Sequence, residues 1–577
     1  MEHIKEKFSQ YTREDVIRFI SIYSIIIFLI VFLVLPLCTL FIKAFQDGDG
    51  NFAGLAQFQR YFESKALVYS ISNTFFIAIL STVISVTLAF FFAFALSRKN
   101  VPFKSFFRYV GMIPIFAPTM LLGIALIYLF GNQGIFTSLG LEIPLYGKVG
   151  IIMAESIYCF PVATTILMVA FSAADNRLYE AADTMGTSSL RKMLTITIPN
   201  VKYGLISAVF VTFTYSFTDF GAPSVVGGNY NVLATDVYKQ VVGQQNFNMG
   251  AVVGIILLFP AVVSFAADRI IGKKQSSSIS SKAVPYVIKP HRPTDILATV
   301  FCVIIALAML LFFAVALFAS LIRLWPYDLT FTLSNYDLSN VASGEGLQAF
   351  RNSVVISILT ALAGTFITFI GAYMVETVRG FGKSRRLMYF LSITPLAIPG
   401  TVVGLSFILF FNASEFPIPF APDYALVNPL HGIYGTIWII VLANMIHFYS
   451  VPFTTATTAL KRLDREFETV SESLGVPFYK TMRRVTLPLC LPAICEMAVY
   501  FFVNSLVTVS AVVFLYSPTV KIAAVAIVNM EGAGETAPAV AMCMLLLIIN
   551  LIIRFIYECL QSHWNKKSAS ANSGGKQ

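Results

Sequence analysis

The sequence predicts an all-α polytopic membrane protein with about twelve membrane-spanning helices, arranged as two tandem halves of six. Hydrophobic residues make up 57% of the chain and charged residues only 12%, whereas soluble proteins carry roughly 25% charged residues. The apolar residues form long runs separated by short polar segments, at about 20 residues per span. Polar and proline motifs of the first half recur in the second half, which indicates an internal repeat.

Helices are the expected spanning elements because lipid cannot hydrogen-bond the backbone. The uninterrupted apolar runs also differ from the alternating pattern of a membrane barrel. The expected spans are Val16–Phe45, Leu67–Leu96, a third that ends near Phe130, Gly147–Phe171, Tyr203–Val226, Met249–Ile271, Asp295–Ile322, Asn352–Glu376, Leu387–Phe411, Gly435–Leu460, Leu489–Tyr516 and Ala537–Tyr557.

The domain division follows the ends of these runs. A serine-rich basic segment separates the two halves and is typical of a linker. The expected parts are an N-terminal segment 1–17, a first domain 18–271, a linker 272–293, a second domain 294–560 and a tail 561–577.

Proline pairs interrupt the third span of each half. Pro114 and Pro118 are four residues apart, as are Pro395 and Pro399, and in both halves a glycine follows five residues later. A proline inside a helix removes a backbone donor and clashes with the preceding turn. We therefore expect a kink in both spans.

The basic residues predict the orientation of the chain. Its formal charge is +10, and Lys and Arg concentrate in alternate loops, in the linker and at both ends. The positive-inside rule then places both termini and the linker in the cytoplasm. This distribution follows topology and gives no indication of nucleic-acid binding. The seven cysteines contain no Cys-x-x-Cys pair, which argues against a metal or redox site.

A polar loop follows the fourth span in each half. Its features in the first half are Glu180, Ala181, Ala182, Gly186, Ile196 and Pro199. In the second half, 289 positions later, Gly475, Leu487 and Pro488 recur, whereas Thr469-Val470-Ser471 replaces Glu-Ala-Ala and Glu468 lies just before it. Membrane insertion does not require such fixed spacing, so the repeated loop is a candidate functional element.

This spacing resembles the signature of permease subunits of ABC-type importers. The resemblance covers nearly the whole chain and implies two fused permease domains of the type I, MetI-like fold in a bacterial cytoplasmic (inner) membrane. It implies that each loop docks on one of two copies of a cytoplasmic ATPase, and that an extracytoplasmic binding protein delivers the substrate. ATP and Mg would bind to the partner subunits, so no cofactor and no metal is expected on this chain.

The residue types of the first loop fit this role. Two short helices that meet at Gly186 would form a compact knob, because glycine tolerates the turn between them. Glu180 and Asp183 are expected to favour the N-terminal turn of a helix.

Polar residues within the fifth spans are the candidates for the substrate pathway, because a charge at the bilayer centre costs about 2.5–3.5 kcal/mol. In the resembled family the fifth helices line that pathway. Hydrogen bonding between helices is the alternative role for these hydroxyl and amide groups. The same two roles, contact with the substrate and hydrogen bonding between helices, are open for Glu155, Asn444, His447 and Glu496. The candidates are Tyr215, Thr218, Asp219, Asn504, Ser505, Thr508 and Ser510.

Two other classes of function are alternatives. An ion-coupled secondary transporter also fits twelve spans in two halves, with Glu155, Asp219 and Glu496 as possible relays. A membrane enzyme is disfavoured, because no catalytic cluster occurs. Gly382-Lys383-Ser384 lacks the first glycine of a phosphate-binding loop, since that position is Thr377.

The substrate is predicted by similarity alone. Residues 217–223, 243–247 and 507–513 resemble the 2-aminoethylphosphonate branch of these importers, which is the favoured substrate. Ferric iron is the second candidate, and polyamine and thiamine permeases are relatives.

Overall fold

The computed structural model describes residues 13–278, 284, 286–341, 344–378, 381–418, 421–464 and 466–574. Within them, nine helices are long and apolar enough to cross a membrane, and three bent helix pairs raise the number to twelve if each pair is one span. This confirms the predicted helical membrane fold. The described strands form two short antiparallel hairpins, β1 (Ile322–Leu324) with β2 (Asp328–Phe331) and β3 (Glu415–Ile418) with β4 (Ala421–Val427).

The helices follow the order of the predicted spans. Those of the first half are α2 to α3 (Arg13–Ala44), α5 (Lys65–Arg98), α6 (Lys104–Met112), α7 (Thr119–Phe130), α9 (Lys148–Ser172), α11 to α12 (Ser189–Thr218) and α15 (Phe247–Ser278). Those of the second half are α16 (Arg292–Ser320), α17 (Gly346–Glu376), α18 (Gly382–Ile393), α19 (Gly400–Phe411), α20 (Ile437–Phe448), α21 (Ser450–Lys461), α23 to α25 (Phe478–Val507) and α27 (Thr536–Gly574).

The proline pairs break the third span of each half. Pro114 lies in a 3-10 turn, Ile113–Phe116, and Ala117 is extended before α7 begins. The second half repeats this break, and its two helical parts meet at 111°. The predicted kinks are confirmed, and each is a complete interruption of the helix.

The predicted ends of the fifth spans were wrong. The sequence placed them at 226 and 516, but α12 (Ile198–Thr218) ends at Thr218 and α25 (Leu491–Val507) ends at Val507. The apolar residues beyond form returning segments, 219–226 with the short helix α13 (Gly221–Val226) and 508–516 with turns. Hydropathy could not separate these segments from the helices, because both are apolar and largely buried.

Each returning segment packs against the broken third span of its own half. A Cβ on Gly123 would lie 3.1 Å from the Cβ of Val225, and one on Gly404 would lie 2.7 Å from the carbonyl oxygen of Ala511. The glycine that follows each proline pair therefore allows the close approach of the returning segment.

The chain forms two compact units, which do not coincide with the two sequence repeats. One unit joins Met1–Ile42 to Gln348–Ala523 and Ile548–Gln577, and the other joins Lys43–Leu347 to Ala524–Leu547. The first span therefore belongs with helices of the second half, where α2 (Arg13–Leu29) packs on α18. Conversely, α16 belongs with helices of the first half and packs on α5, α6 and α7.

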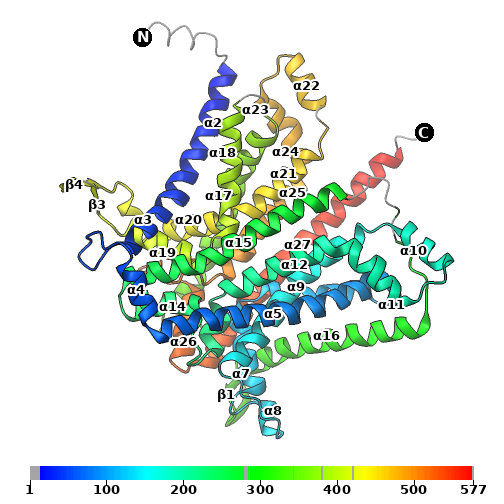
Figure 1. Cartoon of the computed structure of the whole chain (residues 1–577), viewed down its shortest axis with the longest axis horizontal. Helices are drawn as coiled ribbons and strands as arrows, with labels where there is room; N and C mark the ends of the chain where they lie inside the picture. Colours follow the sequence, from blue (N-terminus) through cyan, green and yellow to red (C-terminus); the bar gives the residue numbers. More distant parts are fainter. Residues whose placement is uncertain are drawn as a thin grey trace. The chain divides into compact units, whose positions relative to one another are not determined.

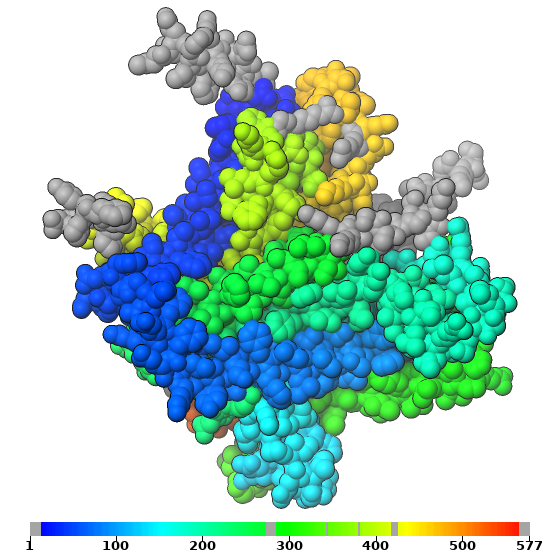
Figure 2. Space-filling view, in the orientation of Figure 1, coloured from blue at the N-terminus to red at the C-terminus, as the bar shows by residue number. Residues whose placement is uncertain are grey.

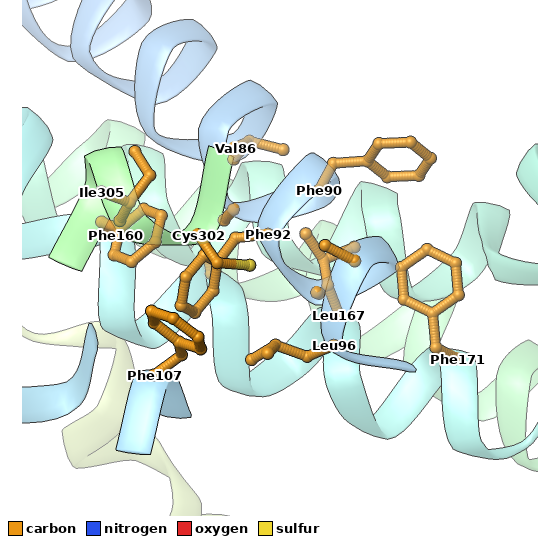
Figure 3. Close-up of a cluster of buried hydrophobic side chains, with 14 of the residues drawn as sticks. Val86, Phe90, Phe92, Leu96, Phe107, Phe160, Leu167, Phe171, Cys302 and Ile305 are labelled. Atoms are coloured by element: carbon orange, nitrogen blue, oxygen red, sulfur yellow. The ribbon is translucent and has the colours of Figure 1, made fainter. Parts of the chain in front are cut away.

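An apolar core joins α5, α9, α12 and α16 within the second unit (Figure 1). Phe92 of α5 and Phe160 of α9 meet with their ring centroids 5.3 Å apart, and Cys302 of α16 is buried in the same cluster (Figure 3). Dispersion contacts of this kind hold helices together in lipid, where apolar burial alone provides no driving force.

We expect Gly404→Ala to lower the thermal stability of the purified chain in detergent, because the added Cβ would press on the backbone of the returning segment. The shift should be several degrees, measured by the loss of monodisperse protein on heating. Gly432→Ala is the matched control, since a Cβ there meets nothing within 4 Å. Equal stability of the two variants would contradict this account of the proline-glycine pattern.

Candidate functional site

The repeated polar loops each form two short helices joined at a glycine. The first coupling segment, residues 176–199, contains α10 (Asn176–Thr184) and α11 (Ser189–Lys192), and it lies at the surface (Figure 2). Gly186 joins the helices with φ of +66°, in the left-handed region that favours glycine. The predicted knob of two helices is therefore present.

The helix caps differ from the sequence prediction. Asp175 caps α10 by accepting a hydrogen bond from the backbone N–H of Arg177 at 3.1 Å. Glu180 and Asp183, which were expected in the N-terminal turn, lie in the middle and last turn of α10. Their expected role at the helix dipole was wrong, because the helix begins four residues before Glu180.

The predicted coupling residues occupy both helices and the start of the fifth span. Glu180 accepts a hydrogen bond from the side chain of Asn176 at 2.7 Å. Ala182 is buried, whereas Ala181 and Gly186 are exposed. Ile196 is half-buried in a π-helical turn, Met193–Thr197, and Pro199 lies at the exposed start of α12.

The described end of the linker packs against α10. The backbone N–H of Asn176 donates to the carbonyl oxygen of Val284 at 3.0 Å, and the N–H of Val284 donates to Asp175 at 3.2 Å. Lys289 forms an ion pair with Asp183 at 2.7 Å, and Lys192 pairs with the same carboxylate. These two lysines hold the pKa of Asp183 below its usual value.

Arg98 connects this contact to the membrane-spanning helices. Its guanidinium lies 4.1 Å from the ring centroid of Tyr286 and 5.2 Å from that of Tyr179, and it donates to the carbonyl oxygen of Phe171 at 2.8 Å. A displacement of α10 would therefore be transmitted through one side chain to the end of α5 and to the end of α9.

The second coupling segment, residues 466–488, has the same shape. It contains α22 (Glu466–Ser473) and α23 (Phe478–Thr481), and Gly475 between them has φ of +65°. Leu487 and Pro488 lie in the short helix α24 (Leu487–Leu489) and are exposed. The space-filling view shows α22 at the surface of its unit (Figure 2).

Different neighbours support the second coupling segment. Tyr373 of α17 donates to Glu468 at 3.2 Å. Arg18 of α2 lies 3.9 Å from a carboxylate oxygen of Glu472 and 5.4 Å from the ring centroid of Phe478. Burial raises the pKa of Glu468 above its usual value. Contacts with the linker thus stabilise the first segment, and contacts with α2 and α17 stabilise the second.

The spacing of the repeat shows which residue of the first half corresponds to Glu468. It lies 289 positions after Tyr179, not after Glu180. Tyr179 donates to Thr197 at 3.1 Å, and Glu468 contacts the corresponding Thr486. Glu468 is therefore an anchor of its segment and does not take the place of Glu180. Sequence reasoning missed Tyr179, Arg98 and Tyr286, because a contact between distant aromatic and basic residues leaves no periodic signal.

The fifth-span candidates fall into two groups. Some are satisfied locally: Thr218 donates to the carbonyl of Thr214 at 2.9 Å, and Asn504 donates to that of Tyr500 at 2.8 Å. Ser510 packs on Gly400, where a Cβ would overlap its hydroxyl.

The other group contacts neighbouring helices. Tyr215 lies near Tyr158 of α9, with the rings tilted by 51° and their centroids 6.2 Å apart. Asp219, the residue after the end of α12, lies next to Glu155 of α9. In the second half, Asn444 donates to Ser505 at 2.7 Å. Thr508 begins the second returning segment, as Asp219 begins the first. Glu155 and Asn444 thus each contact a candidate residue of the fifth span, which their positions in the sequence did not indicate.

No group of three or more His, Cys, Asp or Glu side chains that could hold a metal ion occurs among the described residues.

We expect Asp183→Asn and Lys289→Ala to increase amide hydrogen exchange in residues 176–192 several-fold, because each removes the charged contact between linker and α10. A carboxyl with a lowered pKa contributes its contact above the ordinary value of about 3.9, and the contact is lost as pH falls through the lowered value. Protection should therefore be constant from about pH 5 to 8. Asp328→Asn, which removes an exposed pair with Arg323, is the control that should leave this segment unchanged.

Comparison with known proteins shows two matches to one family. The description "binding-protein-dependent transport system inner membrane component" matches residues 85–277 and again residues 364–566. The ferric transport system permease protein FbpB of Actinobacillus pleuropneumoniae is 27% identical over 560 residues, which cover 93% of this chain and 77% of the relative. A putative ferric transport system permease of Haemophilus influenzae is also 27% identical, over 87% of this chain and 78% of its own length.

A further relative matches only part of the chain. The putative 2-aminoethylphosphonate transport system permease protein PhnV of Salmonella typhimurium is 26% identical over 257 residues, which cover 44% of this chain and 89% of the relative.

Proposed function

The chain belongs to the family of inner membrane components of binding-protein-dependent transport systems, and we propose that it couples import to ATP hydrolysis through its two coupling segments. It is an ABC importer permease by family, spans the membrane several times and works with partner subunits of such systems. In the proposal, each coupling segment docks on one cytoplasmic ATPase subunit. A single permease chain then serves two ATPase copies.

The repetition of one exposed shape supports this assignment. Gly186 and Gly475 both take a left-handed conformation between two short helices, at the same distance before the fifth span of each half. A continuous helical path leads from α11 to Thr218, whereas the path from α23 to Val507 bends by 77° at the break between Leu489 and Leu491. Closure of the ATPase pair would therefore move the fifth helices directly.

The proposal also includes topology and cofactors. Both termini, the linker and the two coupling segments face the cytoplasm of a bacterial cell, as the basic loops predict. ATP and Mg bind to the partner ATPase, so this chain has no ATPase activity of its own. A binding protein outside the membrane delivers the substrate.

Ferric iron is the substrate that we propose. The relatives that are named for ferric transport match this chain along both halves, whereas those named for 2-aminoethylphosphonate match less than half of it. 2-Aminoethylphosphonate is the second candidate, because relatives named for its transport also match part of the chain.

We expect Gly186→Asp and Gly475→Asp each to reduce substrate uptake at least ten-fold, because an aspartate is strained at a positive φ and places a charge on the docking surface. The chain should still reach the membrane in normal amount, measured by blotting. The ATPase subunit should co-purify less well with both variants.

Gly140→Asp is the matched control, since Gly140 also has a positive φ of +90° and open space around it. It lies outside the coupling segments and should leave uptake unchanged. Normal transport by both coupling variants would exclude the coupling role.

Uptake should depend directly on ATP. Cells that carry the complete importer should accumulate radioactive ferric iron, and depletion of ATP should abolish the uptake. A protonophore applied with ATP held constant should leave most of it. Uptake that survives ATP depletion but collapses with the protonophore would identify an ion-coupled secondary transporter. Accumulation of labelled 2-aminoethylphosphonate in place of iron would reverse the substrate order.

A further inference from the structure

Glu155 is a buried carboxyl group without a hydrogen-bond donor. It lies in the middle of α9 and has no exposed surface. Neither carboxylate oxygen has a hydrogen-bond partner among the described residues. Burial of a charged or polar group without a partner is costly, and such groups within membrane spans are usually functional.

A second carboxyl group lies beside it. Asp219, at the end of α12, is adjacent to Glu155, as is the hydroxyl of Ser216. One Asp219 oxygen accepts the backbone N–H of Ala222 at 2.9 Å. Two ionised carboxylates repel each other, so the pair is stabilised either by a shared proton or by a bound cation. Asp219 is half-buried, whereas Glu155 has no exposed surface.

The other groups that face this pair carry oxygen or sulfur. Tyr158 and Cys159 lie on α9, and Tyr215 lies on α12. Both tyrosines are half-buried and Cys159 is fully buried, with its thiol directed to the carbonyl of Thr212 at 3.8 Å. No basic side chain is among these neighbours. The local charge is therefore acidic and is not neutralised by the described residues that touch it.

The second half provides a comparison, because it has other residues at the positions that correspond to Glu155, Ser216 and Asp219. The residues 289 positions after Glu155, Ser216 and Asp219 are Asn444, Ser505 and Thr508. Asn444 donates to Ser505 at 2.7 Å, and Ser505 donates to Thr360 of α17 at 3.4 Å. The corresponding helices α20 and α25 pack together as α9 and α12 do. The Oδ1 atom of Asn444 is buried and has no hydrogen-bond partner among the described residues. Uncharged side chains thus accommodate the same helix contact, so packing alone does not explain the two carboxyl groups of the first half.

We propose that Glu155 and Asp219 form an acidic site that binds positively charged cargo during its passage through the first half of the chain. This inference rests on the proposed transport function and extends it to the substrate class. A ferric ion, as a hard cation, suits the carboxylate and phenol oxygens gathered here. The ammonium group of 2-aminoethylphosphonate would be attracted by the same charge, whereas its phosphonate group would be repelled.

The test replaces the acidic pair with the residues of the second half. Glu155→Asn with Asp219→Thr should be compared with the wild-type chain in the purified complex with its ATPase subunits. Retention of radioactive ferric citrate and of labelled 2-aminoethylphosphonate by the complex should be measured without ATP. We expect at least ten-fold weaker retention of whichever cargo the wild type holds, and at least ten-fold slower ATP-driven uptake in liposomes. ATP hydrolysis stimulated by the loaded binding protein should remain within two-fold.

Asp268→Asn is the control, because Asp268 is a carboxyl within α15 whose partner, Ser207, donates to it at 2.5 Å. This variant should retain cargo like the wild type. Glu155→Gln preserves size and keeps the test valid if the double variant does not assemble. Equal cargo retention by wild type and acidic-pair variants, or retention of neither cargo by the wild type, would overturn the site. Failure of ATP-driven uptake in a wild type that still retains cargo would instead count against the proposed function.

Discussion

The bilayer provides no hydrogen-bonding solvent, and this constraint determines where the chain can leave a helix. Both halves interrupt the third span at a proline pair and end the fifth helix before the apolar run is complete. In each half, the segment that follows the fifth helix packs on the residues after the break in the third span, so each irregular segment shields the other from lipid. Gly123 and Gly404 permit that approach. The irregular backbone of these segments is thus buried in protein, where it is not exposed to lipid.

The coupling segments show how a repeated shape can be supported in two ways. Both place a left-handed glycine between short helices, but the linker and Arg98 hold the first, whereas Arg18 and Tyr373 hold the second. A charged contact through Lys289 is exposed and sensitive to salt. The contact of Tyr373 with Glu468 is half-buried and is therefore less sensitive to salt. The two coupling segments therefore differ in the contacts that stabilise them, and the second also lacks the Glu-Ala-Ala residues of the first.

The polar interior carries the clearest difference between the halves. Asn444 and Ser505 form a neutral hydrogen-bonded pair between helices, while the corresponding Glu155 and Ser216 lie beside Asp219. One repeat therefore serves as an internal reference for the other. The second half shows that helix packing does not require carboxyl groups at these positions, so Glu155 and Asp219 are specific to the first half.

The sequence by itself determined the helical membrane class, the two repeats, the breaks at Pro114 and Pro395, and the turn at Gly186. These features depend on local chemistry, namely hydropathy, the missing donor of proline and the conformational freedom of glycine. Only the tertiary structure decided that α12 ends at Thr218, that α16 belongs with helices of the first half, and that Glu468 corresponds to Tyr179. It also decided that the linker reaches α10 through Val284 and Lys289. Those outcomes depend on packing between segments far apart in the chain, and such contacts leave no periodic pattern from which they could be predicted.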